Sequence, residues 1–280
     1  MNDNEAARQQ RETRDNWSLR AGEWNQQADH MARLAKGLNE PLIAAAGVAP
    51  GHQVLDIASG VGEPALSMAK LVGPDGRVTA TDLVANMLAG AERRAREQGL
   101  TNMRFQVTPM EDLPFADDSF DAVTCRLGLM YTPSPETAAA QARRVLRTGG
   151  RAAFLVWGPK ADNSQFIIVD RVLAEVAGID PHEGAFTPTR LGEDGALNQV
   201  LQAGGFSAWE EQSLRFSPRV DPDSNFWRPQ LALRLGDRLG AMDDGERQRL
   251  DDAMRQAYED LRDGDRAQLQ VHARIGIGTA

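Results

Sequence analysis

The stretch Val54-Leu55-Asp56-Ile57-Ala58-Ser59-Gly60-Val61-Gly62 decides the fold of this 280-residue chain. Its first four residues form a short, mostly apolar run after a Pro50-Gly51 turn, which predicts a buried β-strand. Two glycines one residue apart then predict a tight turn, and Pro64 suits the start of a helix. The free N–H groups at such a helix start favour an anionic or carboxylate-bearing ligand.

Strands and helices alternate outward from this stretch. Further strands are expected at residues 78–81, 103–107, 120–125, 151–157, 207–216 and 271–277, with helices at 85–98, 135–147 and 196–204. This alternation predicts βαβ units and an α/β fold with a mostly parallel sheet. Helical stretches at about 159–200 and 222–265 are interpreted as a cap over the carboxyl ends of the strands, where ligands bind.

The N-terminal segment, residues 1–45, is interpreted as helical and as covering the site, and residues 46–280 as the main domain. Residues 1–15 are charged and are expected to be frayed. From Trp17 to Leu38, apolar side chains recur at helical spacing, which predicts one long amphipathic helix. Trp17 and Trp24 on this stripe either pack against the core or wall a substrate pocket, and both readings stay open.

Composition restricts the class of protein. A single cysteine, Cys125, excludes an intrachain disulfide, and with a polar N-terminus it favours the cytoplasm. No apolar run is long enough to span a membrane. The net charge of −9 argues against a nucleic-acid partner, and basic residues near 93–96 and 143–147 are interpreted as solvated helix faces. Four scattered histidines give no metal-ligand spacing, and no Ser–His–Asp arrangement can be read.

Asp82 ends the second expected strand, 20 residues beyond Gly62. An acid at this spacing can accept hydrogen bonds from ribose hydroxyls, although it could instead only cap the next helix. The pattern Gly60-x-Gly62-x-x-Ala65 also permits a dinucleotide, so an NAD(P)-dependent oxidoreductase remains an alternative, as does a non-catalytic cofactor-binding protein. Asp56 favours S-adenosylmethionine, because its carboxylate would repel a pyrophosphate and counter a positive amino group.

Several motifs, in order, carry a family resemblance. They are residues 54–62, 78–82, 86–88, 111–115, 118–121 and 144–151. Together they resemble the class I S-adenosylmethionine-dependent methyltransferases, in the group that includes the ubiquinone/menaquinone C-methyltransferases. The resemblance implies a Rossmann-like sheet of seven strands, the last antiparallel, and transfer of a methyl group to carbon, oxygen or nitrogen of a small-molecule acceptor. S-adenosylhomocysteine would be the product, and no metal is expected.

The same resemblance implies roles for matched residues. The cofactor-binding set is Asp56, Ala58, Gly60, Gly62, Asp82, Leu83, Met87, Met110, Glu111, Arg126 and Leu127. In this set Asp56 and Gly60 lie near the methionine part, Asp82 at the ribose, Leu83 and Met87 beside the adenine, and Met110 and Glu111 at its edge. Arg126 and Leu127 border the methionine part and the substrate.

Two residues depart from the family pattern. Ala58 stands where a first glycine is common, and Pro109 stands where an acid often accepts from the adenine amino group. The candidates for a catalytic base are Tyr131, His182 and His30, and the candidate substrate pocket comprises Trp17, Trp24 and Tyr131. The identity of the acceptor and the formation of a homodimer are left open by the sequence.

Overall fold

The structure of the chain is a computed structural model that describes residues 3–180, 188–235 and 237–280. Within these ranges, the side chains of residues 3, 4, 6, 30, 31, 34, 229, 232, 233 and 237 fall outside the description.

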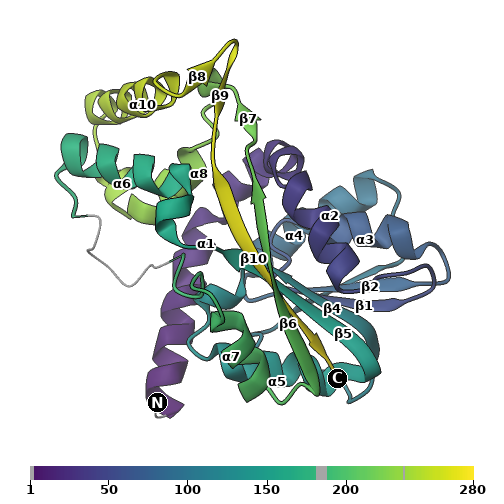
Figure 1. The fold of residues 1–280 in the computed structure, drawn as a ribbon. Helices are drawn as coiled ribbons and strands as arrows, with labels where there is room; N and C mark the ends of the chain where they lie inside the picture. The colour runs from purple at the N-terminus through teal and green to yellow at the C-terminus, as the bar shows by residue number, and fades with distance from the viewer. Residues whose placement is uncertain (1–2, 181–187, 236) are drawn as a thin grey trace.

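A seven-stranded sheet forms the centre of the molecule, in the order β3-β2-β1-β4-β5-β10-β6 (Figure 1). Its strands are β1 (Gln53–Ile57), β2 (Arg77–Asp82), β3 (Met103–Val107), β4 (Phe120–Arg126), β5 (Leu146–Trp157), β6 (Ala208–Phe216) and β10 (Val271–Thr279). The last strand, β10, runs antiparallel to both β5 and β6, and the other neighbouring pairs are parallel. The sequence prediction of a mostly parallel, Rossmann-like sheet with an antiparallel last strand is therefore confirmed.

The register of the central strands brings their carboxyl ends to one edge. Ile57 at the end of β1 pairs with Thr81 of β2 and with Cys125 of β4. Arg126 at the end of β4 pairs in turn with Leu155 of β5. Residues that come directly after β1, β2 and β4 therefore lie close together, as is usual for a ligand site in an open α/β sheet.

Helices cover both faces of the sheet (Figure 1). One face carries α2 (Lys36–Ala45), α3 (Ala65–Val72) and α4 (Ala85–Glu97), and the other carries α5 (Pro135–Val145) and α7 (Ala196–Ala203). Leu42, Met68 and Leu88 pack on the first face, and Ala139 and Leu197 on the second. The strands are buried between two helical layers, which explains why the first of them reads as a continuous apolar run apart from Asp56.

The cap has a core of its own. It comprises α6 (Ser164–Ala177), α8 (Arg228–Leu235), α9 (Asp237–Ala241), α10 (Asp244–Glu259) and the 3₁₀ turns η2 (Lys160–Asp162) and η3 (Pro222–Ser224). Trp227, Met254 and Tyr258 are buried at its centre. Figure 1 shows it as a lobe beside the carboxyl edge of the sheet, with α6, α8 and α10 together.

Short strands begin at the carboxyl end of the range 222–265, which is otherwise mostly helical. A three-stranded sheet of β7 (Arg219–Val220), β9 (Arg266–Gln268) and β8 (Arg262–Asp263) joins the cap to the long strands β6 and β10. Gly264, with a φ of +71°, makes the turn between β8 and β9. Strands of two or three residues are too short to show alternation, so the sequence did not reveal this sheet.

The N-terminal helix is longer than its apolar stripe indicates. Helix α1 spans Asp3–Leu34, so the expectation that residues 1–15 are frayed is wrong. The composition of this segment favours helix, and so does the close approach of Arg8 to Glu12, one turn away, although the segment has no apolar stripe. A turn at Ala35 separates α1 from α2, so the expected single helix to Leu38 is two helices.

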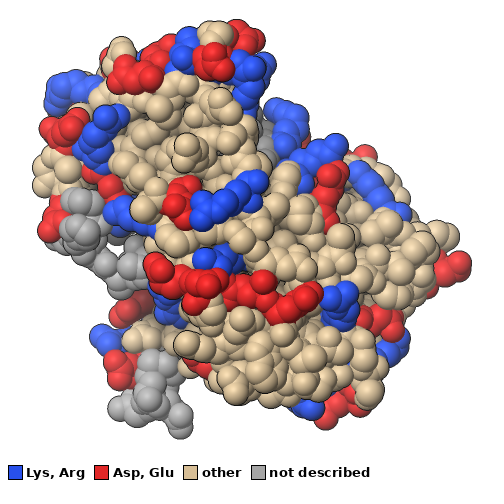
Figure 2. All heavy atoms as spheres, viewed as in Figure 1, with Lys and Arg blue, Asp and Glu red and all other residues tan. Residues whose placement is uncertain are grey.

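On the face seen in Figure 2, a row of Asp and Glu side chains crosses the middle, and Lys and Arg side chains are scattered around it. The absence of a nucleic-acid partner stays a prediction. Of the helices in the described part of the chain, none combines the length and the apolar character that a membrane crossing requires.

Candidate functional site

A cavity of about 400 Å³ opens at the carboxyl edge of the sheet. Its size falls within the usual range for small-molecule sites. The wall contains Ala58, Gly60 and Glu63 from the glycine-rich turn, Asp82, Leu83 and Met87 after β2, Met110 and Glu111 after β3, Arg126, Leu127 and Tyr131 after β4, Trp17 and Trp24 from α1, and Lys160, Asp170 and Arg234 from the cap. Nine of the eleven residues expected to bind the cofactor are in this wall, and Asp56 and Gly62 are not.

The two glycines of the turn, Gly60 and Gly62, have different structural roles. A Cβ at Gly60 would meet no heavy atom within 4 Å, so this glycine leaves open space in the cavity wall. A Cβ at Gly62, by contrast, would lie 2.9 Å from the Leu66 side chain and 3.2 Å from that of Ala91. Gly62 therefore allows α3 and α4 to pack closely, whereas Gly60 is the position where a ligand can approach bare backbone.

Ala58 adopts the left-handed conformation for which glycine is suited. Its φ is +54°, and that of Leu127 is +56°. Both residues line the cavity, and both come directly after strands that end at the site. Non-glycine residues in this region cost energy and gather at functional sites. The geometry explains why the family pattern often has a glycine at position 58.

Asp56 lies beneath the cavity rather than in its wall. Its side chain is buried and accepts hydrogen bonds from Thr124 Oγ1 at 2.6 Å and Ser59 Oγ at 2.7 Å. Burial raises the pKa of Asp56 to about 6, against the opposing effect of these two hydrogen bonds and of Arg126. Asp56 is therefore not positioned to contact a ligand in the cavity directly. Its carboxylate instead supports the glycine-rich turn from below.

Glu63 is an acid in the wall that the sequence reasoning missed. It comes directly after Gly62, and its Oε2 accepts from Ser67 Oγ at 2.7 Å. Arg126 lies next to it and donates from Nε and Nη2 to the Glu63 carbonyl oxygen, at 3.3 and 3.1 Å. An acidic side chain, Glu63, and a basic side chain, Arg126, thus lie together at the end of β4. The ammonium and carboxylate groups of an amino acid could bind to this pair.

Asp82 both caps a helix and faces the cavity. Its Oδ1 accepts from the Val84 N–H and its Oδ2 from the Gly60 N–H, both at 2.9 Å. The carboxylate therefore links the turn after β1 to the turn after β2. A carboxylate has about four lone-pair sites, so Asp82 can also accept from a ligand donor. Burial raises the pKa of Asp82 to about 6, and the backbone N–H groups oppose that shift.

The residues after β3 meet α1 across the cavity. Glu111 accepts a hydrogen bond from Thr132 Oγ1 and a longer one, at 3.5 Å, from Gln10 Nε2 of α1. Pro109 and Met110 line the cavity beside it. The contact with Gln10 depends on the first turns of α1, which the charged sequence of residues 1–15 had led us to expect to be frayed.

The aromatic side chains expected to form a substrate pocket do come together. The ring of Trp17 lies 6.0 Å from that of Trp24 and 5.2 Å from that of Tyr131, measured between centroids. Both tryptophans pack on a cluster with Val61, Val84 and Met87, which places them over the turns after β1 and β2. The indole Nε1 of Trp24 is buried and has no hydrogen-bond partner among the described residues.

Tyr131 is in the wall but is poorly suited to act as a base. Burial raises the pKa of its phenol above the ordinary value, while the charge of Arg20 opposes that change. The phenol is therefore neutral near pH 7 and can donate a hydrogen bond. The other candidate bases lie outside the described part of the structure: His182 is in the 181–187 gap, and His30 has a described backbone in α1 but not a described side chain.

Arg94 attaches α1 to the glycine-rich turn. It was interpreted as part of a solvated helix face, yet its side chain is only 8% exposed. Its Nη1 donates to the Val61 carbonyl oxygen at 2.7 Å, and its Nη2 donates to Asp29 of α1 at 3.1 Å. Sequence periodicity could have placed Arg94 on the inner face of α4, together with Met87 and Ala91.

The cap contributes a wall that sequence reasoning also missed. Trp157 at the end of β5 and Phe166 of α6 pack edge to face, with centroids 5.5 Å apart. Beside them, Asp170 of α6 forms ion pairs with Lys160 and with Arg234 of α8. These residues come from separate segments of the chain, so no local motif connects them.

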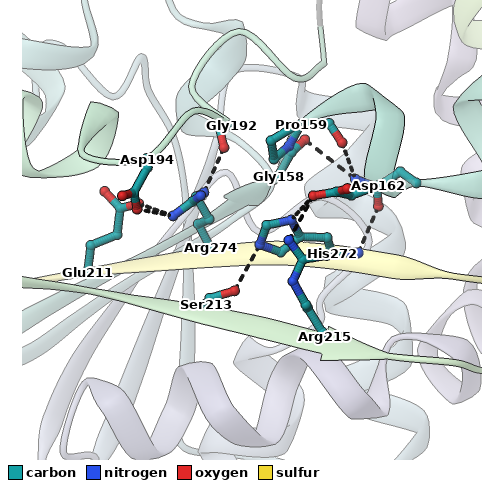
Figure 3. Close-up of polar contacts among 11 residues, drawn as sticks. Gly158, Pro159, Asp162, Gly192, Asp194, Glu211, Ser213, Arg215, His272 and Arg274 are labelled. Carbon is teal, nitrogen blue, oxygen red and sulfur yellow. Dashed lines mark hydrogen bonds and ion pairs between the residues drawn. The ribbon is translucent and has the colours of Figure 1, made fainter.

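A polar network holds the cap segments to β10 (Figure 3). His272 contacts Asp162 Oδ2 through Nδ1 at 2.8 Å and Ser213 Oγ through Nε2 at 2.9 Å. This is a Ser–His–Asp arrangement that the sequence did not reveal. None of the three residues lines the cavity, and the Asp162 carboxylate also pairs with Arg215, so the network is interpreted as an anchor for η2.

Arg274 forms a second anchor one pleat along the same strand. It donates to the Gly192 carbonyl oxygen at 2.7 Å and pairs with Asp194 and Glu211, both at 2.7 Å (Figure 3). The segment that it holds carries Pro188 and Thr189 into the cavity wall. Within the described residues there is no group of three or more His, Cys, Asp or Glu side chains that could hold a metal ion.

Comparisons with known proteins agree with this architecture. Residues 54–150 match a family model described as a methyltransferase domain. The UbiE ubiquinone/menaquinone biosynthesis C-methyltransferase of Cupriavidus taiwanensis is 42% identical over 126 residues, which are 42% of this chain and 49% of that protein. The uncharacterised protein Rv1405c of Mycobacterium tuberculosis is 41% identical over 116 residues, 41% of each chain. The chain thus spans less than half the length of these curated relatives.

Solved structures share the fold at lower identity. The YcgJ protein of Bacillus subtilis superposes with a TM-score of 0.55 at 22% identity, covering 86% of this chain and 96% of that one. Geranyl diphosphate C-methyltransferase of Streptomyces coelicolor A3(2), solved with S-adenosylhomocysteine, superposes with a TM-score of 0.53 at 19% identity, covering 89% of this chain and 80% of that one.

Proposed function

Residues 54–150 match a methyltransferase domain, and on this premise we propose that the chain is a class I S-adenosylmethionine-dependent methyltransferase that transfers a methyl group to a small-molecule acceptor. Support for a small acceptor comes from the enclosure of the site. The cavity has walls from the sheet edge, from α1 and from the cap, and about 400 Å³ is a volume for small molecules rather than for a macromolecular surface.

The residues in the wall fit S-adenosylmethionine. Gly60 leaves open space beside backbone, and Asp82 offers carboxylate lone pairs next to it. Asp82 would hold the ribose hydroxyls, and Leu83 and Met87 would flank the adenine. Glu63 and Arg126 would hold the amino and carboxylate groups of the methionine part, because they present opposite charges at the end of β4. The observation that carries the proposal is the position of Asp82 beside the open Gly60.

When bound, S-adenosylmethionine supplies a methyl group on a sulfonium, which is already a good leaving group. The contribution of this chain is then to orient the acceptor and to exclude water. Trp17, Trp24 and Tyr131 close the cavity on the α1 side, and Trp157 and Phe166 close it on the cap side. The neutral phenol of Tyr131 can donate a hydrogen bond that orients an acceptor oxygen or nitrogen.

Calorimetry with the purified full-length chain tests the proposal. We expect S-adenosylhomocysteine to bind and NAD to give no heat of binding. The reverse preference would favour an oxidoreductase and would contradict the proposal. Transfer of label from methyl-labelled S-adenosylmethionine to a mixture of small phenols, acids and amines tests turnover. Cofactor binding without transfer to any member of a broad set would instead support a non-catalytic binding protein.

A further inference from the structure

The indole of Trp24 lies beside the part of the cavity that fits the adenine. It packs in one cluster with Val84 and Met87, which follow β2, and it lines the cavity together with Leu83. Leu83 and Met87 are the residues that would flank the adenine of the cofactor. A role for Trp24 in holding the base therefore rests on the proposed function, because it requires a ligand with an adenine ring.

A notch on α4 fixes the position of Trp24. A Cβ at Gly90 would lie 1.6 Å from Asn25 Oδ1, so any larger residue would displace the Asn25 side chain. Asn25 Nδ2 donates to the Asn86 carbonyl oxygen at 3.1 Å, and Arg93 Nη2 donates to Asn25 Oδ1 at 3.2 Å. These contacts hold the turn of α1 that carries Trp24 against the first turns of α4, beside the proposed adenine site.

The indole Nε1 of Trp24 is a hydrogen-bond donor that lacks an acceptor. The atom is buried, and no described residue accepts from it. An indole nitrogen can only donate, and a buried donor that stays unpaired lowers stability. An acceptor atom on a ligand would remove this cost. Because Nε1 is covered by its neighbours, the indole ring has to turn toward the cavity to reach such an acceptor.

An adenine ring has the acceptors that this donor requires. Its ring nitrogens N1, N3 and N7 accept hydrogen bonds, whereas its amino group donates them. An ionised Glu111, at the edge of the site, can only accept, so it suits the amino group. Five other side chains that line the cavity around the site carry no N–H or O–H group for a ring nitrogen: Leu83, Val84, Met87, Pro109 and Met110.

We propose that Trp24 binds the adenine base directly, with its indole N–H donating to a ring nitrogen and its ring covering the base on the α1 side. Pro109 stands where an acid often holds the adenine amino group, so a donor from α1 would supply a polar contact from the opposite direction. Trp24 precedes residues 54–150, and the contact would thus come from a segment outside the matched methyltransferase domain.

The test removes the acceptor nitrogens of the ligand one at a time. The full-length chain is titrated in a calorimeter with S-adenosylhomocysteine and with its 1-deaza, 3-deaza and 7-deaza analogues, in which a C–H group replaces one ring nitrogen. We expect at least one analogue to bind about tenfold more weakly than S-adenosylhomocysteine. Trp24→Phe keeps an aromatic ring without the N–H, so it should bind that analogue and S-adenosylhomocysteine equally well.

Trp209→Phe is the matched control, because Trp209 is an exposed residue of β6 that does not line the cavity. It should bind all four ligands as the wild-type chain does. If Trp24→Phe fails to fold, the wild-type chain labelled with [15N]tryptophan provides a second measurement. The chain has five tryptophans, and one indole N–H resonance should move downfield with S-adenosylhomocysteine but not with the weakened analogue.

Equal affinity for all four ligands, a loss of affinity that Trp24→Phe retains, or indole resonances that do not distinguish the ligands would overturn the inference. Each of these results leaves the methyltransferase proposal standing, because S-adenosylhomocysteine still binds. A wild-type chain that does not bind S-adenosylhomocysteine at all would instead contradict the proposed function itself.

Discussion

Asp82 connects three parts of the site through one carboxylate. It accepts from Gly60 on the glycine-rich turn and from Val84 at the start of α4, and it faces the cavity. The Asp82→Ala substitution would remove both the proposed ligand hydrogen bonds and the support of the turn. Charge-assisted hydrogen bonds contribute about 1.5–3 kcal/mol, so affinity for S-adenosylhomocysteine should fall roughly tenfold or more.

Calorimetry on folded Asp82→Ala protein measures this effect. Asp75→Ala is the control, because Asp75 is an exposed acid in the turn between α3 and β2 and does not line the cavity. Unchanged affinity in the Asp82 variant, with the wild-type melting temperature, would mean that the ribose is held elsewhere.

Ala58 offers a prediction about stability rather than binding. Its left-handed backbone, with φ at +54°, costs a residue with a Cβ about 1–2 kcal/mol. Ala58→Gly should therefore raise the free energy of unfolding by about 1 kcal/mol and the melting temperature by roughly 2 °C. Differential scanning calorimetry checks it. Ala253→Gly, inside α10, is the matched control and should lower stability by about 0.5–1 kcal/mol. A lower melting temperature for Ala58→Gly would contradict the left-handed assignment.

At the scale of elements, α1 depends on α4 for its position over the site. Arg94 of α4 provides the polar link, because it donates hydrogen bonds both to Asp29 of α1 and to the Val61 carbonyl oxygen of the glycine-rich turn. Arg94→Met keeps most of the packing volume but removes these bonds, and it should lower the free energy of unfolding by about 2 kcal/mol. Affinity for S-adenosylhomocysteine should fall as well, because Val61 belongs to the glycine-rich turn.

The Asp29→Ala variant separates the two bonds of Arg94. Asp29 is 82% exposed, and an ion pair with an exposed partner contributes about 0–1 kcal/mol. Chemical denaturation of both variants provides the measurement. If Asp29→Ala were as destabilising as Arg94→Met, the ion pair with α1, and not the hydrogen bond to the Val61 carbonyl oxygen, would account for the lost stability.

The elements differ in how far the sequence could predict them. The turn after β1 and the position of Asp82 are encoded by a strand, a pair of glycines and a fixed spacing, which are local signals. The early part of α1 has no apolar stripe, so its helix is encoded only by propensity and by pairs such as Arg8–Glu12. Arg94 was misinterpreted because a basic residue beside Arg93 and Arg96 looks solvated, although Arg94 alone of the three is buried.

The cap residues that line the cavity could not be predicted from the sequence, for a different reason. Lys160, Asp170 and Arg234 lie in the 3₁₀ turn η2, in α6 and in α8, which meet only because the cap folds around Trp227 and Tyr258. Their contact is a property of tertiary packing, for which one sequence holds no periodic signal. The contacts of His272 with Asp162 and Ser213 could not be predicted for the same reason, because they require β6 and β10 to pair in a known register.

At the scale of the whole molecule, cofactor binding should depend on pH. Burial raises the pKa of both Asp56 and Asp82 to about 6, above the value of 3.8 expected in the unfolded chain. These two groups therefore favour the folded state below pH 3.8, and that contribution is lost as the pH rises through 6. In the proposed complex an ionised Asp82 accepts from the ribose hydroxyls more strongly than a neutral one, so cofactor binding has the opposite dependence and improves with rising pH.

The expected size of the effect can be calculated from the ionised fraction. Near pH 5 only about a tenth of Asp82 is ionised, and affinity for S-adenosylhomocysteine should be roughly tenfold weaker than at about pH 7.5. Calorimetric titrations at both values, in buffers of different ionisation enthalpy, should also detect proton release on binding near pH 6. The Asp82→Ala variant should have a flatter profile. A constant affinity between these two pH values in the wild type would contradict the assignment.

Helix α1 lines the cavity with Gln10, Thr13, Trp17, Trp24, Ala28 and Ala32, and is fastened at Gln10 and Asp29. A molecule bound behind α1 would leave more easily if the helix moved away from the cavity. We therefore expect the residence time of the spent cofactor to be set by how often α1 detaches, more than by the sum of its own contacts. Weaker attachment of α1 would then speed the release of the spent cofactor but lower the affinity for it. The turnover rate and the cofactor affinity would thus depend on the same helix in opposite ways.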